Sequence, residues 1–178
     1  MKRTVLVFGL ISGAIMSSLM LVVTMPLTDR IGFDKAEILG YTTMIASFLM
    51  IYFGVRSYRD NLAGGTITFT RALGLGLLIT VVACVCYVVT WEVMYFGFGF
   101  WRDFMDKYAA YMVEHAKAAG ASAQEVELQL KQMETYKEMY ENPLFNIAMT
   151  FVEPVPVGLL ISFISAGLLR KKVTSQPQ

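Results

Sequence analysis

The chain has 178 residues, of which 56% are hydrophobic and 16% are charged, and its formal net charge is +1. About a quarter of the residues in a soluble domain are charged, so this chain has little polar material to cover a surface that faces water. The composition excludes a disordered chain and a disulfide scaffold, and the low net charge argues against a nucleic-acid-binding protein. The mean hydropathy of +0.53 favours a membrane protein.

Four apolar runs are long enough to cross a bilayer as helices. A hydrocarbon core of about 30 Å requires about 20 apolar residues in a helix. The runs extend over residues 5–25, 38–55, 72–92 and 144–169, and none contains a lysine or an arginine. They are continuous rather than alternating, which favours helices over barrel strands. We therefore expect an all-α fold, a single polytopic membrane domain with four transmembrane helices.

The first run follows Lys2 and Arg3, as the core of a secretory signal follows its basic residues. It is about 21 residues long, whereas a signal core has 7–15, and no Ala-x-Ala cleavage site follows it. We therefore expect this helix to be retained in the protein.

The distribution of basic residues predicts the orientation in the membrane. Cytoplasmic segments carry an excess of lysine and arginine. The N-terminus, the segment between the second and third runs, and the C-terminal tail share this excess. Their basic residues are Lys2, Arg3, Arg56, Arg59, Arg71, Arg170, Lys171 and Lys172, against the one acid Asp60. We expect both termini to be cytoplasmic. The same residues are suited to contact anionic lipid head groups, although the charge bias alone accounts for them.

The segment between the third and fourth runs predicts a helical hairpin over residues 101–141. Apolar residues recur at steps of three and four from Trp101 to His115, which is typical of a helix. Ser122 and Glu125 have capping-box spacing and predict a second helix that ends near Glu141. We expect this αα-hairpin to be extracytoplasmic. Its apolar stripes either pack on each other or on the membrane surface, or form a docking face for a partner.

Other local signals mark the ends of the predicted helices. Asp34 and Glu37 have capping-box spacing before the second run. Asn142-Pro143 predicts an N-cap and first helical residue for the fourth run, and Gly64-Gly65 predicts a turn. An interfacial aromatic belt is expected from Tyr95, Phe96, Phe98, Phe100 and Trp101.

Two acidic residues lie close to the membrane and are candidates for a functional role. Glu153 lies 17 residues before Arg170, which is about 25 Å along a helix and slightly inside the outer edge of the hydrocarbon core. Glu92 lies 21 residues after Arg71, or about 31 Å, which places it at that edge.

Two prolines make the surroundings of Glu153 unusual. Pro154 and Pro156 each lack the N–H group of a helix donor, so we expect the fourth helix to kink or open there. Freed carbonyl groups beside a carboxylate are what an ion or proton site requires. Alternatively, Glu153 only accepts hydrogen bonds from threonine or tyrosine hydroxyl groups and marks where the helix enters the lipid.

The sequence contains no recognisable catalytic or metal-binding motif. Cys84 and Cys86 are two residues apart on a helix and point to different sides, so we expect them to be packing residues. His115 is the only histidine and has no second ligand nearby. No H-E-x-x-H, G-x-S-x-G or Walker A motif is present. We therefore expect no enzyme activity, no cofactor and no metal.

Small residues recur every four positions in the first and fourth runs. Such positions allow helices to approach closely. We expect them to hold the bundle together, and contact between two protomers is the alternative. They are Gly9, Gly13 and Ser17 in the first run and Gly158, Ser162 and Ala166 in the fourth.

Several short motifs occur in order along nearly the whole chain. They are Gly9-Leu10-Ile11-Ser12-Gly13, Gly40-Tyr41-Thr42-Thr43-Met44, Tyr58-Arg59-Asp60, Thr68-Phe69, Glu153-Pro154 and Pro156-Val157-Gly158-Leu159. Together they resemble the bacterial family called domain of unknown function 4199. The resemblance implies a cytoplasmic-membrane protein of four helices and transfers no catalytic residue. It also implies that Tyr58-Arg59-Asp60 and Glu153-Pro154 belong to a shared pattern, which makes them candidate functional residues.

These observations predict a non-enzymatic accessory or interaction protein of the bacterial inner membrane. We expect it to be surrounded by the lipid bilayer and to contact a protein partner or a second copy of itself. The alternative is a small ion- or proton-coupled transporter that uses Glu153, with Glu92 assisting.

Overall fold

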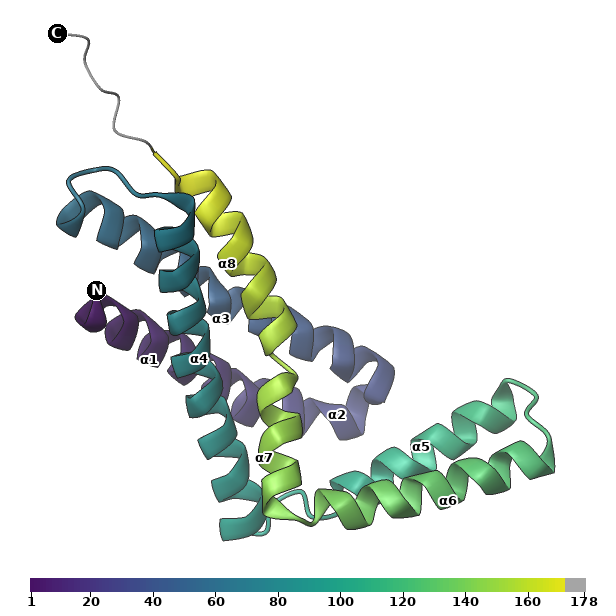
Figure 1. The fold of residues 1–178 in the computed structure, drawn as a ribbon. Coiled ribbons are helices and arrows are strands. Elements are labelled where there is room, and N and C mark those ends of the chain that lie inside the picture. Colours follow the sequence, from purple (N-terminus) through teal and green to yellow (C-terminus); the bar gives the residue numbers. More distant parts are fainter. Residues whose placement is uncertain (172–178) are drawn as a thin grey trace, which may run out of the picture. The chain divides into compact units, whose positions relative to one another are not determined.

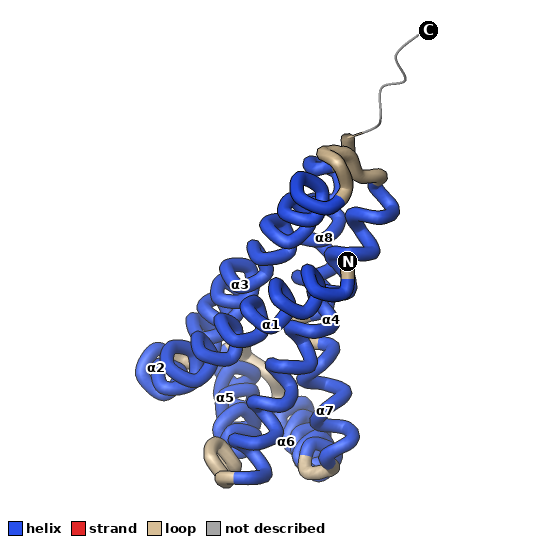
Figure 2. The backbone as a smooth tube through the Cα atoms, turned by 90° about the vertical axis from the view of Figure 1, so that its left-hand side faces the viewer, coloured by secondary structure: helices blue, strands red, loops and turns tan. Residues whose placement is uncertain are grey.

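The structure, a computed structural model, describes residues 1–171, apart from the side chain of Thr24. These residues form helices joined by short turns and contain no β-strand, so the predicted all-α fold class is confirmed (Figure 2). A single isolated bridge joins Ile67 and Lys171. Lys172, which belongs to the basic tail of the sequence, lies outside the described residues.

Four helices are long and apolar enough to cross a membrane, as predicted, and each extends beyond its apolar run. They cover Lys2–Ile31, Phe33–Leu62, Phe69–Gly97 and Pro143–Leu169. The first is composed of α1 (Lys2–Leu19), the π-helical turn η1 (Met20–Thr24) and α2 (Met25–Ile31). The second is α3 (Phe33–Leu62), and the third joins α4 (Phe69–Glu92) to the π-helical turn η2 (Val93–Gly97). The fourth joins α7 (Pro143–Val152) to α8 (Val155–Leu169).

The first helix continues past Pro26, whereas the sequence predicts its end at Met25. A proline inside an α-helix lacks an N–H group and clashes with the carbonyl group four residues earlier. Here η1 ends two residues before the proline, and the N–H group of Met25 bonds to the carbonyl group of Met20, five residues back. This wider turn accommodates the proline ring, so the helix is not broken there.

The predicted capping box of Asp34 and Glu37 is wrong. The N-cap of α3 is Gly32, with a φ of 81°, and no side chain caps this helix. Only Gly32 separates α2 from α3, so the chain must change direction within one residue. Glycine adopts the required left-handed backbone at little cost, and this geometry leaves no room for a preceding cap.

Two other predicted local signals, at Asn142-Pro143 and at Gly64-Gly65, are confirmed. The N–H group of Leu144 donates to Oδ1 of Asn142 at 3.0 Å, so Asn142 caps α7. Gly64 and Gly65 have φ values of 63° and 80° and form the turn after α3. In this turn the N–H group of Gly65 donates to the carbonyl group of Arg59 at 2.9 Å.

The chain divides into two compact units. The first consists of Met1–Val88 and the chain from Phe151 onward, and the second is Val89–Thr150. In Figure 1 the first unit therefore contains α1, α2, α3, most of α4, and α8. The second contains the hairpin of α5 (Phe104–Ala118) and α6 (Ala123–Tyr140), with most of α7.

Contacts in the first unit establish the directions of its helices. The Ser12 hydroxyl group donates to the carbonyl group of Ser47 at 2.9 Å, and Phe8 lies beside Gly54, so α1 and α3 are antiparallel. Other pairs show that α1 is parallel to α4 and that α4 is antiparallel to α8. These pairs are Gly9 with Val82, Gly13 with Cys86, Gly76 with Ser162, and Gly158 with Thr80. The start of α1, the end of α3, the start of α4 and the end of α8 therefore share one end of the unit.

The second unit contains a helical hairpin of α5 and α6, and its place outside the cytoplasm stays a prediction. Ser122 and Glu125 form both hydrogen bonds of a capping box. The Glu125 N–H group donates to Oγ of Ser122 at 3.3 Å, and the Ser122 N–H group donates to Oε2 of Glu125 at 2.7 Å. Gly120, with a φ of 84°, lies in the turn between the helices. The first helix of the hairpin begins at Phe104, later than the predicted Trp101, which lies in the preceding turn with a φ of 59°.

Candidate functional site

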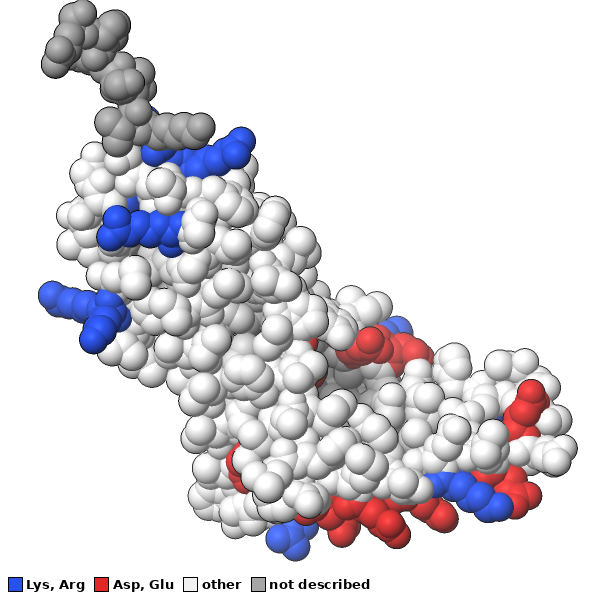
Figure 3. All heavy atoms as spheres, in the orientation of Figure 1, with Lys and Arg blue, Asp and Glu red and all other residues white. Residues whose placement is uncertain are grey.

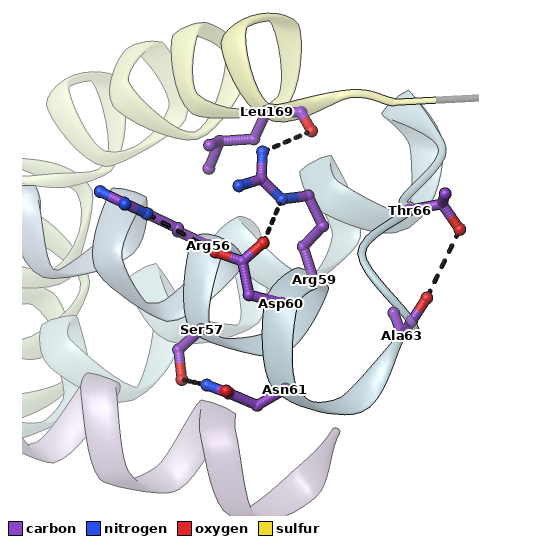
Figure 4. A network of polar contacts seen from close by, with 8 residues as sticks. All are labelled: Arg56, Ser57, Arg59, Asp60, Asn61, Ala63, Thr66 and Leu169. Carbon is purple, nitrogen blue, oxygen red and sulfur yellow. Dashed lines mark hydrogen bonds and ion pairs between the residues drawn. The ribbon is translucent and has the colours of Figure 1, made fainter. Parts of the chain in front are cut away.

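Tyr58, Arg59 and Asp60 lie near the end of α3 and contact neighbouring elements. Nε of Arg59 donates to Oδ1 of Asp60 at 2.7 Å, and Nη1 donates to the carbonyl group of Leu169, the last residue of α8, at 3.4 Å (Figure 4). The guanidinium group of Arg71 lies 5.4 Å from the centroid of the buried Tyr58 ring. These three residues of α3 therefore connect it to the end of α8 and to the start of α4.

Most of the basic residues of the first unit lie at this same end, whereas Arg30 and Lys35 lie where α2 meets α3. The N–H groups of Ile67 and Lys171 each donate to the other residue's carbonyl group, at 3.1 and 3.0 Å, which joins the α3–α4 loop to the segment after α8. Figure 3 shows lysine and arginine side chains on this end of the unit. The Arg56 side chain is 56% exposed even though it pairs with Asp60 at 3.6 Å. This end thus presents a cationic surface.

Glu153 lies where the fourth long helix is interrupted, as the two prolines predict. Glu153 and Pro154 form a turn between α7 and α8, which begins at Val155. Pro156 has no N–H group, so the carbonyl group of Val152 lacks its α-helical donor. The hydroxyl group of Tyr87, on α4, donates to Oε2 of Glu153 at 3.4 Å. This contact is of the kind expected from the simpler alternative, in which Glu153 accepts a bond from a tyrosine.

Glu92 is the last residue of α4 and belongs to the second unit, whereas Glu153 belongs to the first. Oε1 of Glu92 is buried and has no hydrogen-bond partner among the residues that the structure describes. A buried oxygen without a donor is costly, so Oε1 of Glu92 lowers the stability of this unit.

A buried polar network in the second unit was missed by the sequence analysis. Asn146 is fully buried, and its Oδ1 accepts hydrogen bonds from Nε1 of Trp91 at 2.9 Å and from the Thr150 hydroxyl group at 3.2 Å. Its Nδ2 donates to the carbonyl group of Tyr140 at 3.2 Å. The available signal was an asparagine inside an apolar run, because such a residue requires partners when it is buried.

Aromatic rings surround the indole of Trp91 and extend this network. Trp101 and Tyr95 lie nearly parallel to it, with centroid distances of 5.9 and 5.7 Å. Two members of the predicted aromatic belt, Tyr95 and Trp101, therefore pack within the unit. Phe98 and Phe100, by contrast, are 67% and 56% exposed, which leaves them available to a membrane interface.

The small residues of α1 and α8 face neighbouring helices of the first unit. A Cβ atom added at Gly9 would lie 2.6 Å from Val82, and one at Gly13 would lie 2.5 Å from Cys86. The Ser162 hydroxyl group lies 3.3 Å from that of Thr80. These contacts join helices of one chain. Ser17 and Ala166 are also buried.

The remaining candidates do not assemble into a reactive centre. Cys84 is buried, Cys86 packs against α1, and neither is in a disulfide. His115 is exposed, and its ring lies 5.5 Å from that of Tyr111. Within residues 1–171, no group of three or more His, Cys, Asp or Glu side chains could hold a metal ion.

Residues 7–171 match a family model whose description is "Protein of unknown function (DUF4199)". The match covers nearly the whole chain, so the resemblance seen in the short motifs is confirmed. No curated protein and no solved structure matches the chain.

Proposed function

The chain belongs to the DUF4199 family, and from its own residues we propose that it is a non-enzymatic interaction protein of the bacterial cytoplasmic membrane. Its four long apolar helices cross the bilayer. The cationic end of the first unit lies in the cytoplasm with both termini, because lysine and arginine are retained on that side. The hairpin of α5 and α6 then lies outside the cytoplasm and serves as the docking element.

One observation carries this proposal: α6 buries one side within the hairpin and keeps apolar side chains exposed on the other. Val126 of α6 and Met105 of α5 are buried, at 9% and 3% exposure. Leu128 and Met139 are 58% and 44% exposed. They are 11 residues apart, so both lie on one side of the helix.

We define the α6 outer face as the side that carries these two residues. Its members are Leu128, Lys131, Gln132, Thr135 and Met139, which line two shallow, open grooves along the helix. Apolar side chains that are exposed in a row beside polar ones are typical of interaction surfaces. The two helices of the hairpin therefore pack on each other and still leave the α6 outer face exposed for a partner.

The charges of α6 indicate the chemistry of the partner. The helix carries acidic residues at 125, 127, 134 and 138, followed by Glu141, and only two lysines. Lys131 is paired with Glu127 at 2.9 Å, and Lys137 is paired with Asp106. Acidic side chains accordingly line much of the hairpin in Figure 3. We therefore expect a protein partner with apolar and basic residues on its outer surface.

The test combines site-specific crosslinking with surface variants in the native membrane. A photoreactive amino acid replaces Leu128 or Met139, and the matched control places it at the exposed Ala110 of α5. We expect the same protein to crosslink at both α6 positions and not at Ala110. Leu128→Glu with Met139→Glu should abolish its stoichiometric copurification, whereas Ala110→Glu should leave it unchanged.

Two results would contradict the proposal. One is a partner that copurifies equally with the double variant and with a chain that lacks residues 101–141. The other is crosslinking at the α6 positions to lipid alone or to a second copy alone.

A further inference from the structure

We propose that Glu153 is a proton-binding site within the membrane-spanning part of the protein, and that Tyr87 positions its carboxyl group. The inference rests on the interruption between α7 and α8 and does not depend on the docking role of the hairpin.

The depth of Glu153 follows from the length of α8. This helix has 15 residues and ends one residue before the basic Arg170, so Glu153 is about 25 Å from that end. With the basic end at the cytoplasmic surface, the carboxyl group lies inside a hydrocarbon core of about 30 Å. An isolated carboxylate is costly there and requires a neutralising partner.

The protein itself supplies no such partner. Glu153 takes part in no ion pair among residues 1–171. Its hydrogen bond comes from the neutral Tyr87 hydroxyl group, and the charge that acts on it is that of the acidic Glu37 of α3. Neutralisation must therefore come from a bound cation or from a proton.

The composition of the site favours a proton over a metal ion. Cations such as Ca²⁺ or Mg²⁺ require about six or more oxygen ligands. Glu153 belongs to no group of three or more carboxylate, histidine or cysteine side chains within the described residues. A proton, by contrast, requires only the carboxyl group and an acceptor for the new O–H group.

The helix interruption provides what a carboxyl group needs in both states. When ionised, Glu153 accepts the bond from Tyr87. When protonated, Glu153 gains an O–H donor that needs an acceptor. Pro156 has no N–H group to bond the carbonyl group of Val152, so that carbonyl oxygen is free of its helical bond and can serve as the acceptor.

The experiment is carbodiimide labelling of the full-length protein in liposomes. Dicyclohexylcarbodiimide is a hydrophobic reagent that modifies protonated carboxyl groups in membranes. Mass spectrometry of peptides then gives the labelling rate at Glu153 and at Glu92 over a series of pH values. We expect labelling at Glu153 to fall at least tenfold with rising pH, along a single titration curve.

Two variants test the positioning role of Tyr87. Tyr87→Phe should shift the midpoint of the Glu153 curve, because the hydroxyl donor to the carboxylate is removed. Tyr52→Phe is the matched control, since that ring lies near Arg59 at the other end of the first unit, and it should leave the midpoint unchanged. Glu153→Gln should remove the label from that peptide only.

Three outcomes would overturn the proposal. These are the absence of label at Glu153 while Glu92 is labelled, labelling at Glu153 that does not change with pH, and suppression of labelling by sodium or potassium at constant pH. The last result would assign the site to a metal cation. Because the main measurement uses the unmodified chain, a variant that fails to fold does not prevent the test.

Discussion

Replacement of Gly158 by alanine tests whether α8 packs against α4 as the structure shows. The added Cβ atom would lie 2.9 Å from the Thr80 hydroxyl oxygen, closer still to its methyl group, and 3.2 Å from the Phe48 ring. Thr80 and Phe48 are 4% and 0% exposed, so neither can move aside easily. Overpacking of this kind costs about 1–3 kcal/mol, which corresponds to a fall in Tm of about 2–12 °C for a chain of this size.

The assay is thermal unfolding of the purified protein in detergent, with Gly167→Ala as the matched control. Gly167 lies on the same helix, but a Cβ atom added there meets nothing within 4 Å. Its replacement should leave Tm unchanged or raise it slightly, since alanine favours the helix. Thr80→Ser removes the closest methyl group and should restore part of the stability of Gly158→Ala. Equal Tm values for the two glycine variants would refute the packing argument.

Three further predictions concern the second unit and the orientation. Asn146→Leu removes the acceptor of a buried indole N–H group and should cost about 1–3 kcal/mol, measured as a lower Tm and faster proteolysis of the hairpin; unchanged values would show that the network is not stabilising. The backbone N–H and hydroxyl groups of Ser122 lower the pKa of Glu125. The capping box therefore stabilises the hairpin at neutral pH, and this contribution is lost as pH falls through the lowered pKa. Glu125→Gln should keep the cap and abolish this pH dependence of helicity, measured by circular dichroism, and a persisting dependence would contradict the assignment. In spheroplasts with an intact inner membrane, a membrane-impermeant maleimide should label the Ala118→Cys variant and not the Ser57→Cys variant. The reverse labelling pattern would show that the orientation is opposite to the proposed one.

Some features of the structure depend on one short segment of the chain, and others depend on how two helices pack. The apolar runs, the capping box at Ser122 and the turn at Gly64-Gly65 are encoded within a few consecutive residues, and the structure contains them. Hydrophobic length and local hydrogen bonding determine such features whatever the rest of the chain does. The sequence alone therefore predicts the four long helices, the hairpin and the interruption at Glu153-Pro154.

Tertiary structure alone decides which distant groups meet. No local pattern indicates that Tyr87 donates to Glu153, that Arg59 reaches the carbonyl group of Leu169, or that Trp91 bonds Asn146. Each of these pairs is separated by at least 55 positions and depends on how the helices are aligned along one another. The continuation of the first helix through Pro26 likewise required the π-helical turn that precedes it, which hydropathy does not encode. Local composition thus specifies the helices, whereas close packing between them determines the partners of each polar side chain, because a buried polar group must find its hydrogen bond wherever the neighbouring helix presents one.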